Sequence, residues 1–303
     1  MDRFLSLPAP ILAAIATALL LEAAMFLILA SERLRARIGD CCPPRQMAAW
    51  LLASALGPYL IYSAVTGTVG ATQAALLIAM AGASAFWFVV IPRSGYADIT
   101  FAVFMSAVIL SGAMKRIYLP PAAKLPVEFL GDIMWARMMM AAVLLIRKMG
   151  GVNLGLWPNR REWAIGFRHY LYFLPIAALL NFALDFARPR TGLGDAGKIA
   201  ASVALTFLAH FVFVALREEL LFRGVMQQAL TRVLANPAAA LAITSIAVGL
   251  GHLPFRQFPN WKFAILAAAG HWFYGKAFQR AGGVRAAMVC HALVNTTWRV
   301  FLA

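Results

Sequence analysis

Five residues able to move protons or donate hydrogen bonds stand in otherwise apolar stretches near the C-terminal end of this chain. They are Glu218, Glu219, His252, His291 and Asn295. An ionisable group at the centre of a membrane helix costs about 2.5 to 3.5 kcal/mol on insertion scales. A chain that places several such groups in apolar segments is expected to use them together. The pattern predicts a catalytic site inside a membrane.

The composition is that of a membrane protein. Hydrophobic residues make up 62% of the 303 residues and charged residues 13%, with a mean hydropathy of +0.77. Soluble domains carry about 25% charged residues. Apolar runs of about 18 to 20 residues recur, which is the length that crosses a hydrocarbon core about 30 Å thick. We therefore predict an all-α, polytopic transmembrane bundle of about eight to ten helices around an intramembrane catalytic cavity.

The net charge of +15 does not indicate a nucleic-acid partner. The basic residues lie in short connections between apolar runs, as in residues 33–37 and 147–161. This distribution is typical of loops that face the anionic headgroups of a lipid bilayer. Arg far outnumbers Lys and Ala is abundant, which is associated with bacterial sources, so we predict a multi-pass protein of the bacterial cytoplasmic (inner) membrane.

Ten apolar runs are expected to form helices. They are residues 11–30, 47–65, 72–91, 99–114, 129–146, 163–184, 199–216, 237–251, 261–278 and 284–302. Glu22 in the first run is expected to be a helix-packing partner or protonated rather than part of a site, whereas Asp132 and Arg137 suggest that 129–146 is partly interfacial. Residues 1–160 hold no cluster of catalytic residue types, so we predict N-terminal transmembrane helices over 1–160 and a catalytic core over 161–303.

The two adjacent carboxylates are expected to do different work. Successive helical residues are about 100° apart, so Glu218 and Glu219 point in different directions. Glu219 and Arg223 are four residues apart and can form an ion pair on one face. Glu218 is then free to act as a general base, for which burial tunes a carboxylate. Taken alone, Glu218 could instead pair with Arg217 or with a basic group on another helix.

The histidines also have two interpretations each. His252 ends an apolar run before a proline, where a helix C-terminus favours an imidazole that takes up positive charge. His291 and Asn295 are four residues apart and can point into one cavity, as two donors to an oxyanion must. Taken alone, each is as readily a cap or an interhelical contact. His271 could line the same cavity, but interhelical hydrogen bonding is the stronger expectation for it.

Together, the motifs resemble a known family. Glu-Glu-x-x-x-Arg at 218–223, an apolar segment ending in His252, and His-x-x-x-Asn at 291–295 resemble the signature of the CPBP intramembrane endopeptidases. That family joins CAAX prenyl endopeptidases with bacteriocin-processing and self-immunity proteins. The resemblance covers residues 202–298. It implies that Glu218, assisted by His252, activates water, that His291 and Asn295 stabilise the oxyanion, and that Glu219 and Arg223 hold the geometry.

One position departs from the pattern. The family commonly has Phe four residues before the second-motif histidine, and this chain has Val248 there. We assign Val248 and Phe222 to the substrate pocket, where the smaller valine changes shape rather than chemistry. The resemblance favours a site without metal or other cofactor. Carboxylate and imidazole could ligate zinc, but the chain has no His-Glu-x-x-His helix.

The sequence therefore predicts a protease. It would be an intramembrane, CAAX-type endopeptidase that cleaves a membrane-delivered, hydrophobic or lipidated peptide or protein. The alternative is a non-catalytic membrane scaffold or immunity protein that binds a peptide partner. A transporter is disfavoured because the chain has no internal repeat or paired broken helices. The sequence carries no signal for an oligomeric state.

Overall fold

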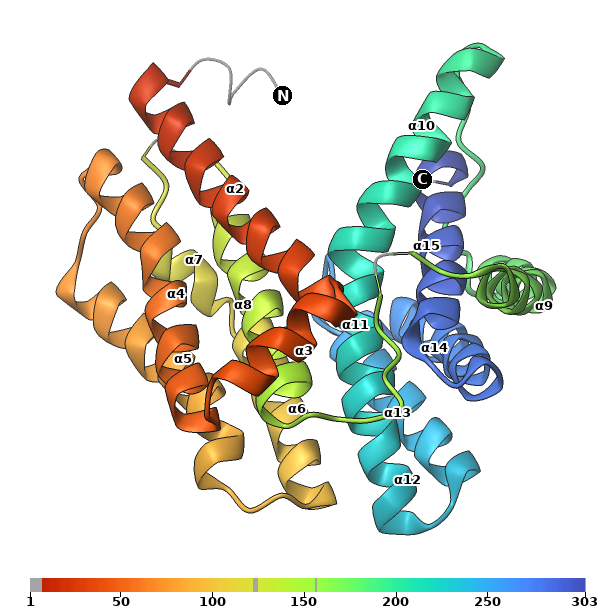
Figure 1. Ribbon diagram of the computed structural model, residues 1–303. Coiled ribbons are helices and arrows are strands. Elements are labelled where there is room, and N and C mark those ends of the chain that lie inside the picture. The colour runs from red at the N-terminus through yellow and green to blue at the C-terminus, as the bar shows by residue number, and fades with distance from the viewer. Residues whose placement is uncertain (1–6, 122–124, 156, 303) are drawn as a thin grey trace. The chain divides into compact units, whose positions relative to one another are not determined.

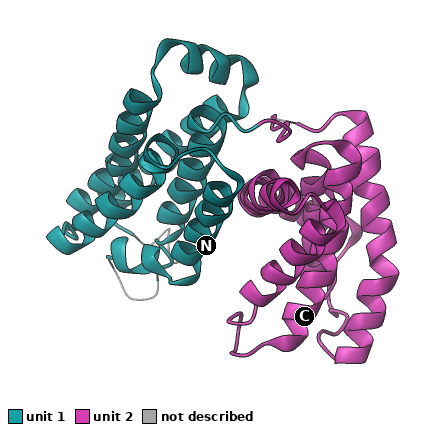
Figure 2. Ribbon diagram, turned by 90° about the horizontal axis from the view of Figure 1, so that it is seen from below, with its two compact units in different colours: residues 1–149 teal, residues 150–303 magenta. Residues whose placement is uncertain are grey.

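The described residues form helices and no strand, as predicted. The computed structural model describes residues 7–121, 125–155 and 157–302, in which Pro189 and Leu302 share an isolated antiparallel bridge. The chain divides into two compact units, residues 1–149 and 150–303 (Figure 2). The sequence placed the division at residue 160. Val152 and Asn153 explain why the second unit begins earlier, because the Val152 carbonyl accepts from Val284 N–H and the Asn153 amide donates to the Gly282 carbonyl.

Unit 1 is a bundle of helices (Figure 1). Its described helices are α2 (Ala9–Ala30), α3 (Glu32–Cys41), α4 (Pro44–Thr66), α5 (Ala71–Val90), α6 (Gly95–Leu110), α7 (Ala113–Ile117) and α8 (Phe129–Ala141), with a π-helical turn η1 (Ala142–Ile146). Helix α3 was not predicted, because its cluster of arginines between two apolar runs is typical of a loop. The Ser31 hydroxyl caps it by accepting from the Leu34 N–H.

Unit 2 contains the candidate motifs. Its described helices are α9 (Arg160–Leu184), α10 (Ala196–Ala209), η2 (His210–Ala215), α11 (Leu216–Glu219), η3 (Leu220–Gln227), α12 (Gln228–Leu234), α13 (Pro237–Gly251), α14 (Trp261–Ala281) and α15 (Val284–Phe301). Helices α10 to α12 are one continuous helix with two π-helical segments. The Asn236 side chain caps α13 by accepting from two backbone N–H groups.

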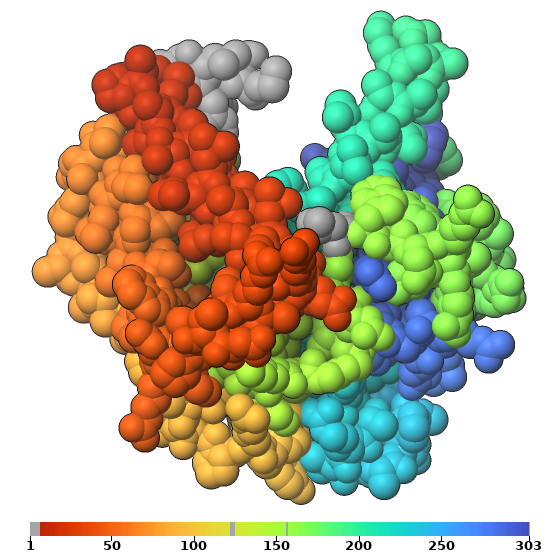
Figure 3. Space-filling model, viewed as in Figure 1, coloured from red at the N-terminus to blue at the C-terminus, as the bar shows by residue number. Residues whose placement is uncertain are grey.

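Within the part of the chain that the structure describes, six helices are long and apolar enough to cross a membrane. They are Ala9–Ala30, Pro44–Thr66, Ala71–Val90, Phe129–Ile146, Arg160–Leu184 and Ala196–Leu234. Two further apolar helices, α6 and α13, are shorter. Nine of the ten predicted apolar runs lie almost wholly in continuous helix, whereas 99–114 is divided between α6 and α7 by a turn at residues 111–112. The chain is a multi-pass, all-α membrane protein. The first turns of α10, which has no buried residue, project beyond its neighbours in unit 2 (Figures 1 and 3).

A buried ion pair joins three helices of unit 1. The Arg137 guanidinium on α8 donates to both Glu22 carboxylate oxygens on α2, at 2.6 and 3.2 Å, and to the Ser54 hydroxyl on α4 at 2.8 Å. Arg137 and Glu22 are each 1% exposed. The expectation that 129–146 is partly interfacial stays a prediction, but the Arg137 charge that suggested it is neutralised inside the bundle. Glu22 is the helix-packing partner that the sequence predicted.

Small residues let the helices of unit 2 approach closely. A Cβ added to Gly249 on α13 would lie 2.6 Å from the Ala264 carbonyl oxygen and 2.7 Å from the Ala268 Cβ of α14. A Cβ added to Gly166 on α9 would lie 2.6 Å from the Ala286 carbonyl oxygen of α15. Close backbone approach of this kind is how membrane helices gain packing energy without a hydrophobic driving force. These contacts fix the helices that carry the second and third motifs.

Removal of one partner of the unit 1 ion pair is expected to destabilise the protein strongly. Glu22→Gln should lower the free energy of unfolding by about 3–5 kcal/mol, because it leaves the Arg137 charge buried and uncompensated. Thermal unfolding in detergent micelles measures the loss. Glu32→Gln, at an exposed position, is the control and should be nearly neutral. A Glu22→Leu, Arg137→Met double variant as unstable as Glu22→Gln would contradict this account.

The close approach of α13 and α14 predicts unequal effects for two neighbouring glycines. Gly249→Ala should lower stability by about 1–3 kcal/mol, since the new methyl group has to displace the α14 backbone. Gly251→Ala is the matched control, because a Cβ there meets nothing within 4 Å. The same unfolding assay compares them. Equal stability of the two variants would show that the helices do not approach as described.

Candidate functional site

The first motif lies on an irregular helix. Glu218 and Glu219 are in the short α-helical segment α11, between the π-helical segments η2 and η3. π-Helical turns are rare, and many occur at functional sites because they redirect side chains. The two carboxylates have different surroundings, as the 100° separation predicted. The Glu219 side chain is wholly buried, whereas that of Glu218 is 21% exposed.

Glu219 holds two partners from inside the bundle. Its Oε2 lies 3.2 Å from the Nε of Arg223, which confirms the predicted ion pair four residues apart. Its Oε1 accepts a hydrogen bond of 2.7 Å from the Nδ1 of His291 on α15. With Nδ1 donating, the other ring nitrogen of His291 points away from Glu219. The ring is held flat against Tyr274, with centroids 4.6 Å apart and planes 14° apart.

Glu218 faces two imidazoles rather than an arginine. Its Oε2 lies 4.0 Å from the Nε2 of His291 and 3.8 Å from the Nε2 of His271 on α14. Both distances exceed the range of a direct hydrogen bond. The structure thus brings Glu218 and His291 together from separate helices, and it adds His271. The pairing with Arg217 that the sequence left open is not what these contacts show.

His271 was not among the residues predicted for the site. It is 3% exposed, and Arg223 donates from Nη1 to its Nδ1 at 2.8 Å and from Nη2 to its backbone carbonyl at 2.5 Å. The expected interhelical hydrogen bond is therefore confirmed, and the same ring also faces Glu218. The only local signal was a histidine in an apolar run, because nothing in the sequence gives the register of α14 against α11.

His252 and Asn295 lie at the edge of this group. The His252 ring is half-buried, donates from Nδ1 to the Val248 carbonyl at 2.8 Å, and has its centroid 6.1 Å from that of His271. Asn295 is half-buried one turn after His291 on α15, and its side chain makes no hydrogen bond with the described residues. The structure places His252 beside His271 and gives no direct contact between His252 and Glu218.

The two predicted pocket residues differ in exposure. Val248 is 3% exposed and faces the helix packing, with its carbonyl bound by His252. Phe222 is half-buried, and its ring meets that of His271 edge to face at 6.1 Å. Phe222 therefore lies against the group that surrounds Glu218. Their assignment to a substrate pocket stays a prediction.

The donor set can be tested for zinc. Among the described residues, Glu218, His271 and His291 offer ligand atoms within 4.8 Å of one another. Zinc bonds of about 2.0–2.2 Å place ligand atoms about 3.3 Å apart, closer than the contacts above. Arginine has no acceptor, so the Nδ1 of His271 accepts, and its Nε2 carries a hydrogen instead of a lone pair. As arranged, the three side chains do not fit a zinc site.

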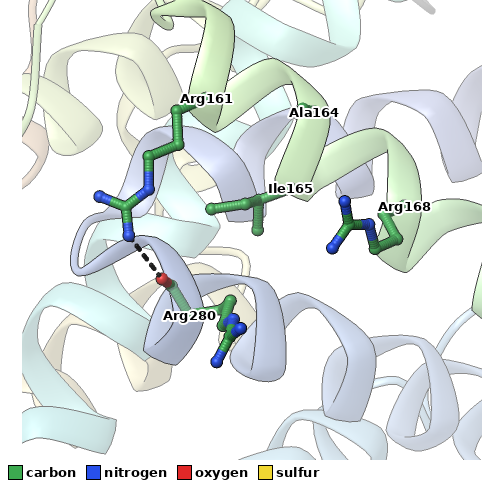
Figure 4. A pocket seen from close by; sticks show the side chains of 5 residues that line it. All are labelled: Arg161, Ala164, Ile165, Arg168 and Arg280. Carbon is green, nitrogen blue, oxygen red and sulfur yellow. Dashed lines mark hydrogen bonds between the residues drawn. The ribbon is translucent and has the colours of Figure 1, made fainter.

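A separate pocket lies elsewhere in unit 2 (Figure 4). It has a volume of about 330 Å³ and is lined by Arg161, Ala164, Ile165 and Arg168 from α9 and by Arg280 from α14. Arg161 donates to the Arg280 carbonyl at 3.4 Å. None of the candidate catalytic residues lines it, so it does not belong to the site around Glu218.

Comparison with protein families agrees with the motifs. Residues 200–297 match the family model described as Type II CAAX prenyl endopeptidase Rce1-like. Comparisons with curated proteins and with solved structures return no match. The matched residues include all three motifs and lie within unit 2. This chain is thus a multi-pass membrane protein in which residues 200–297 match the Rce1-like type II CAAX prenyl endopeptidases, a family of proteases.

Proposed function

We propose that this protein hydrolyses a peptide bond in a hydrophobic or lipidated peptide delivered through the membrane, with Glu218 as the base that activates water. The observation that carries the proposal is the distance of 4.0 Å between Glu218 Oε2 and His291 Nε2, which come from separate helices of an apolar unit. Glu218 is partly exposed and forms no ion pair with any described arginine, so its oxygen lone pairs are available to accept a proton. The setting we propose is the bacterial inner membrane, with no bound metal.

Glu218 alone can carry out both proton transfers that the hydrolysis requires. Its carboxylate takes one proton from water while the water oxygen forms a bond to the carbonyl carbon, and the carbonyl electron pair moves onto the carbonyl oxygen. When that pair returns, the carbon–nitrogen bond breaks and Glu218 gives its proton to the leaving nitrogen.

Asn295 and His291 have different roles in the proposed mechanism. The Asn295 amide is a neutral donor, and it is not engaged by the described residues, so it can bind the carbonyl oxygen. Neutral His291 donates from Nδ1 to Glu219 and presents a lone pair on Nε2. Through that lone pair, His291 can orient the attacking water by accepting a hydrogen bond from it. His252, which lies beside His271, assists Glu218 in activating the water.

Glu218→Gln is expected to abolish cleavage with the fold intact. The amide cannot take a proton from water, so we expect a loss of about 10²- to 10⁴-fold, the range for a general base. Terminal-peptide proteomics of native-host membranes compares wild type, Glu218→Gln and the surface control Glu32→Gln at matched abundance. New peptide termini should appear with wild type and with Glu32→Gln only.

Two results would count against the peptidase. Termini that persist with Glu218→Gln would remove Glu218 from the chemistry. Identical peptide maps for wild type, Glu218→Gln and membranes that lack the protein, in a host where wild type has a phenotype, would favour the non-catalytic scaffold.

Arg223 is expected to matter for folding and Glu218 for chemistry. Arg223→Leu should lower the free energy of unfolding by about 3–5 kcal/mol, because it leaves the Glu219 carboxylate buried without its cation. Glu218→Gln should change stability little, since Glu218 is partly exposed and outside that ion pair. Thermal unfolding in micelles compares them, and an Arg223→Leu variant as stable as wild type would contradict the assignment.

A further inference from the structure

The five histidines of this chain all lie among the described residues, and their ring nitrogens can be compared. Four of them direct Nδ1 at an acceptor: His169 at the Ile165 carbonyl, His210 at the Thr206 carbonyl, His252 at the Val248 carbonyl and His291 at the Glu219 carboxylate. His271 instead directs Nδ1 at the guanidinium of Arg223. A guanidinium only donates. His271 is therefore the one histidine whose neutral ring must carry its hydrogen on Nε2.

Packing holds the His271 ring in this orientation. Arg223 donates to its backbone carbonyl as well as to its Nδ1, so two bonds from one rigid guanidinium fix backbone and ring together. Phe222 and Tyr274 lie against the ring, with centroids 6.1 and 5.0 Å away. A side chain that is 3% exposed has little room to turn. The Nε2–H is thus aimed in a set direction.

That direction is toward Glu218 and His291. Nε2 of His271 lies 3.8 Å from Glu218 Oε2, and Nε2 of His291 lies 4.0 Å from the same oxygen. All three atoms lie within 4.8 Å of one another. One water oxygen can lie about 2.8 Å from each of the three, the length of an ordinary hydrogen bond. The polarity matches too, since Glu218 and His291 accept the two water hydrogens and His271 donates.

We propose that His271 is a further catalytic residue, which holds the attacking water by donating from Nε2 to one of its lone pairs. The inference rests on the proposed function, in which Glu218 is the base. With both hydrogens and one lone pair engaged, the second lone pair is the group left to face the substrate carbonyl. Proton transfer goes from water to Glu218, and His271 keeps its hydrogen throughout. Arg223 is then a positioning residue, which sets the tautomer of His271.

Two substitutions separate this role from a structural one. His271→Asn keeps an amide oxygen near the Nδ1 position for Arg223 but has no group that reaches the water. His271→Gln extends an amide N–H to the Nε2 position. The substrate probe is a synthetic peptide spanning a terminus that depends on wild type in the proteomic comparison, with the protein in lipid nanodiscs.

The expected result is a split between the two variants. His271→Asn should lower kcat by about 10²-fold, as for loss of one preorganised donor, with KM unchanged because the contact is to water. His271→Gln should retain kcat within about tenfold of wild type. Equal losses in both variants, a change in KM alone, or no loss in either would overturn the proposal. Unfolding temperatures of both variants show whether a loss of kcat reflects misfolding.

A spectroscopic measurement decides the tautomer without any substrate. Wild-type protein labelled with ¹⁵N-histidine in micelles should give one imidazole with Nε2 protonated and Nδ1 bare, and that signal should disappear in His271→Asn. A His271 signal with Nδ1 protonated would overturn the proposal even in an active enzyme. Retained cleavage by Glu218→Gln would instead defeat the proposed function, and the tautomer result would stand separately.

Discussion

The buried guanidinium of Arg223 is the constraint on which the site depends. The side chain is wholly buried, and it touches the Glu219 carboxylate on its own helix and both the ring and the carbonyl of His271 on α14. The Glu219 carboxylate beside this guanidinium also accepts a hydrogen bond from His291 on α15. One cation thereby sets the positions of two imidazoles that come from different helices. Glu218 is left outside this network, where it can exchange a proton.

Unit 1 uses the same device for a different purpose. Arg137 binds Glu22 and Ser54 from two other helices, much as Arg223 binds Glu219 and His271. A buried arginine with every partner in place locks the register of neighbouring membrane helices, since any slip would expose a bare charge to lipid. The difference lies in what remains nearby. Around Arg137 the pair is complete, whereas beside Arg223 a second carboxylate faces unengaged imidazole nitrogens.

The sequence predicted what depends on position along one helix. The helices, the Glu219–Arg223 pair and the divergence of Glu218 from Glu219 follow from helical period and hydropathy. The partners of Glu22 and His271 did not follow, because they depend on the register between helices distant along the chain. The π-helical segments were also missed, since residue type does not mark the extra residue that each turn contains.

The hydrogen-bonding polarity of Glu218, His271 and His291 determines which occupant would fit between them. A metal ion requires three lone pairs, and Arg223 removes one by making His271 a donor. A water molecule requires a mixture of acceptors and donors, which two acceptors and one N–H supply. Loss of the Arg223–His271 hydrogen bond would therefore change what the site can bind, although Glu218, His271 and His291 would all still be present. In the proposed mechanism, the residue that joins the helices would thus also favour water over a metal ion as the occupant of the site.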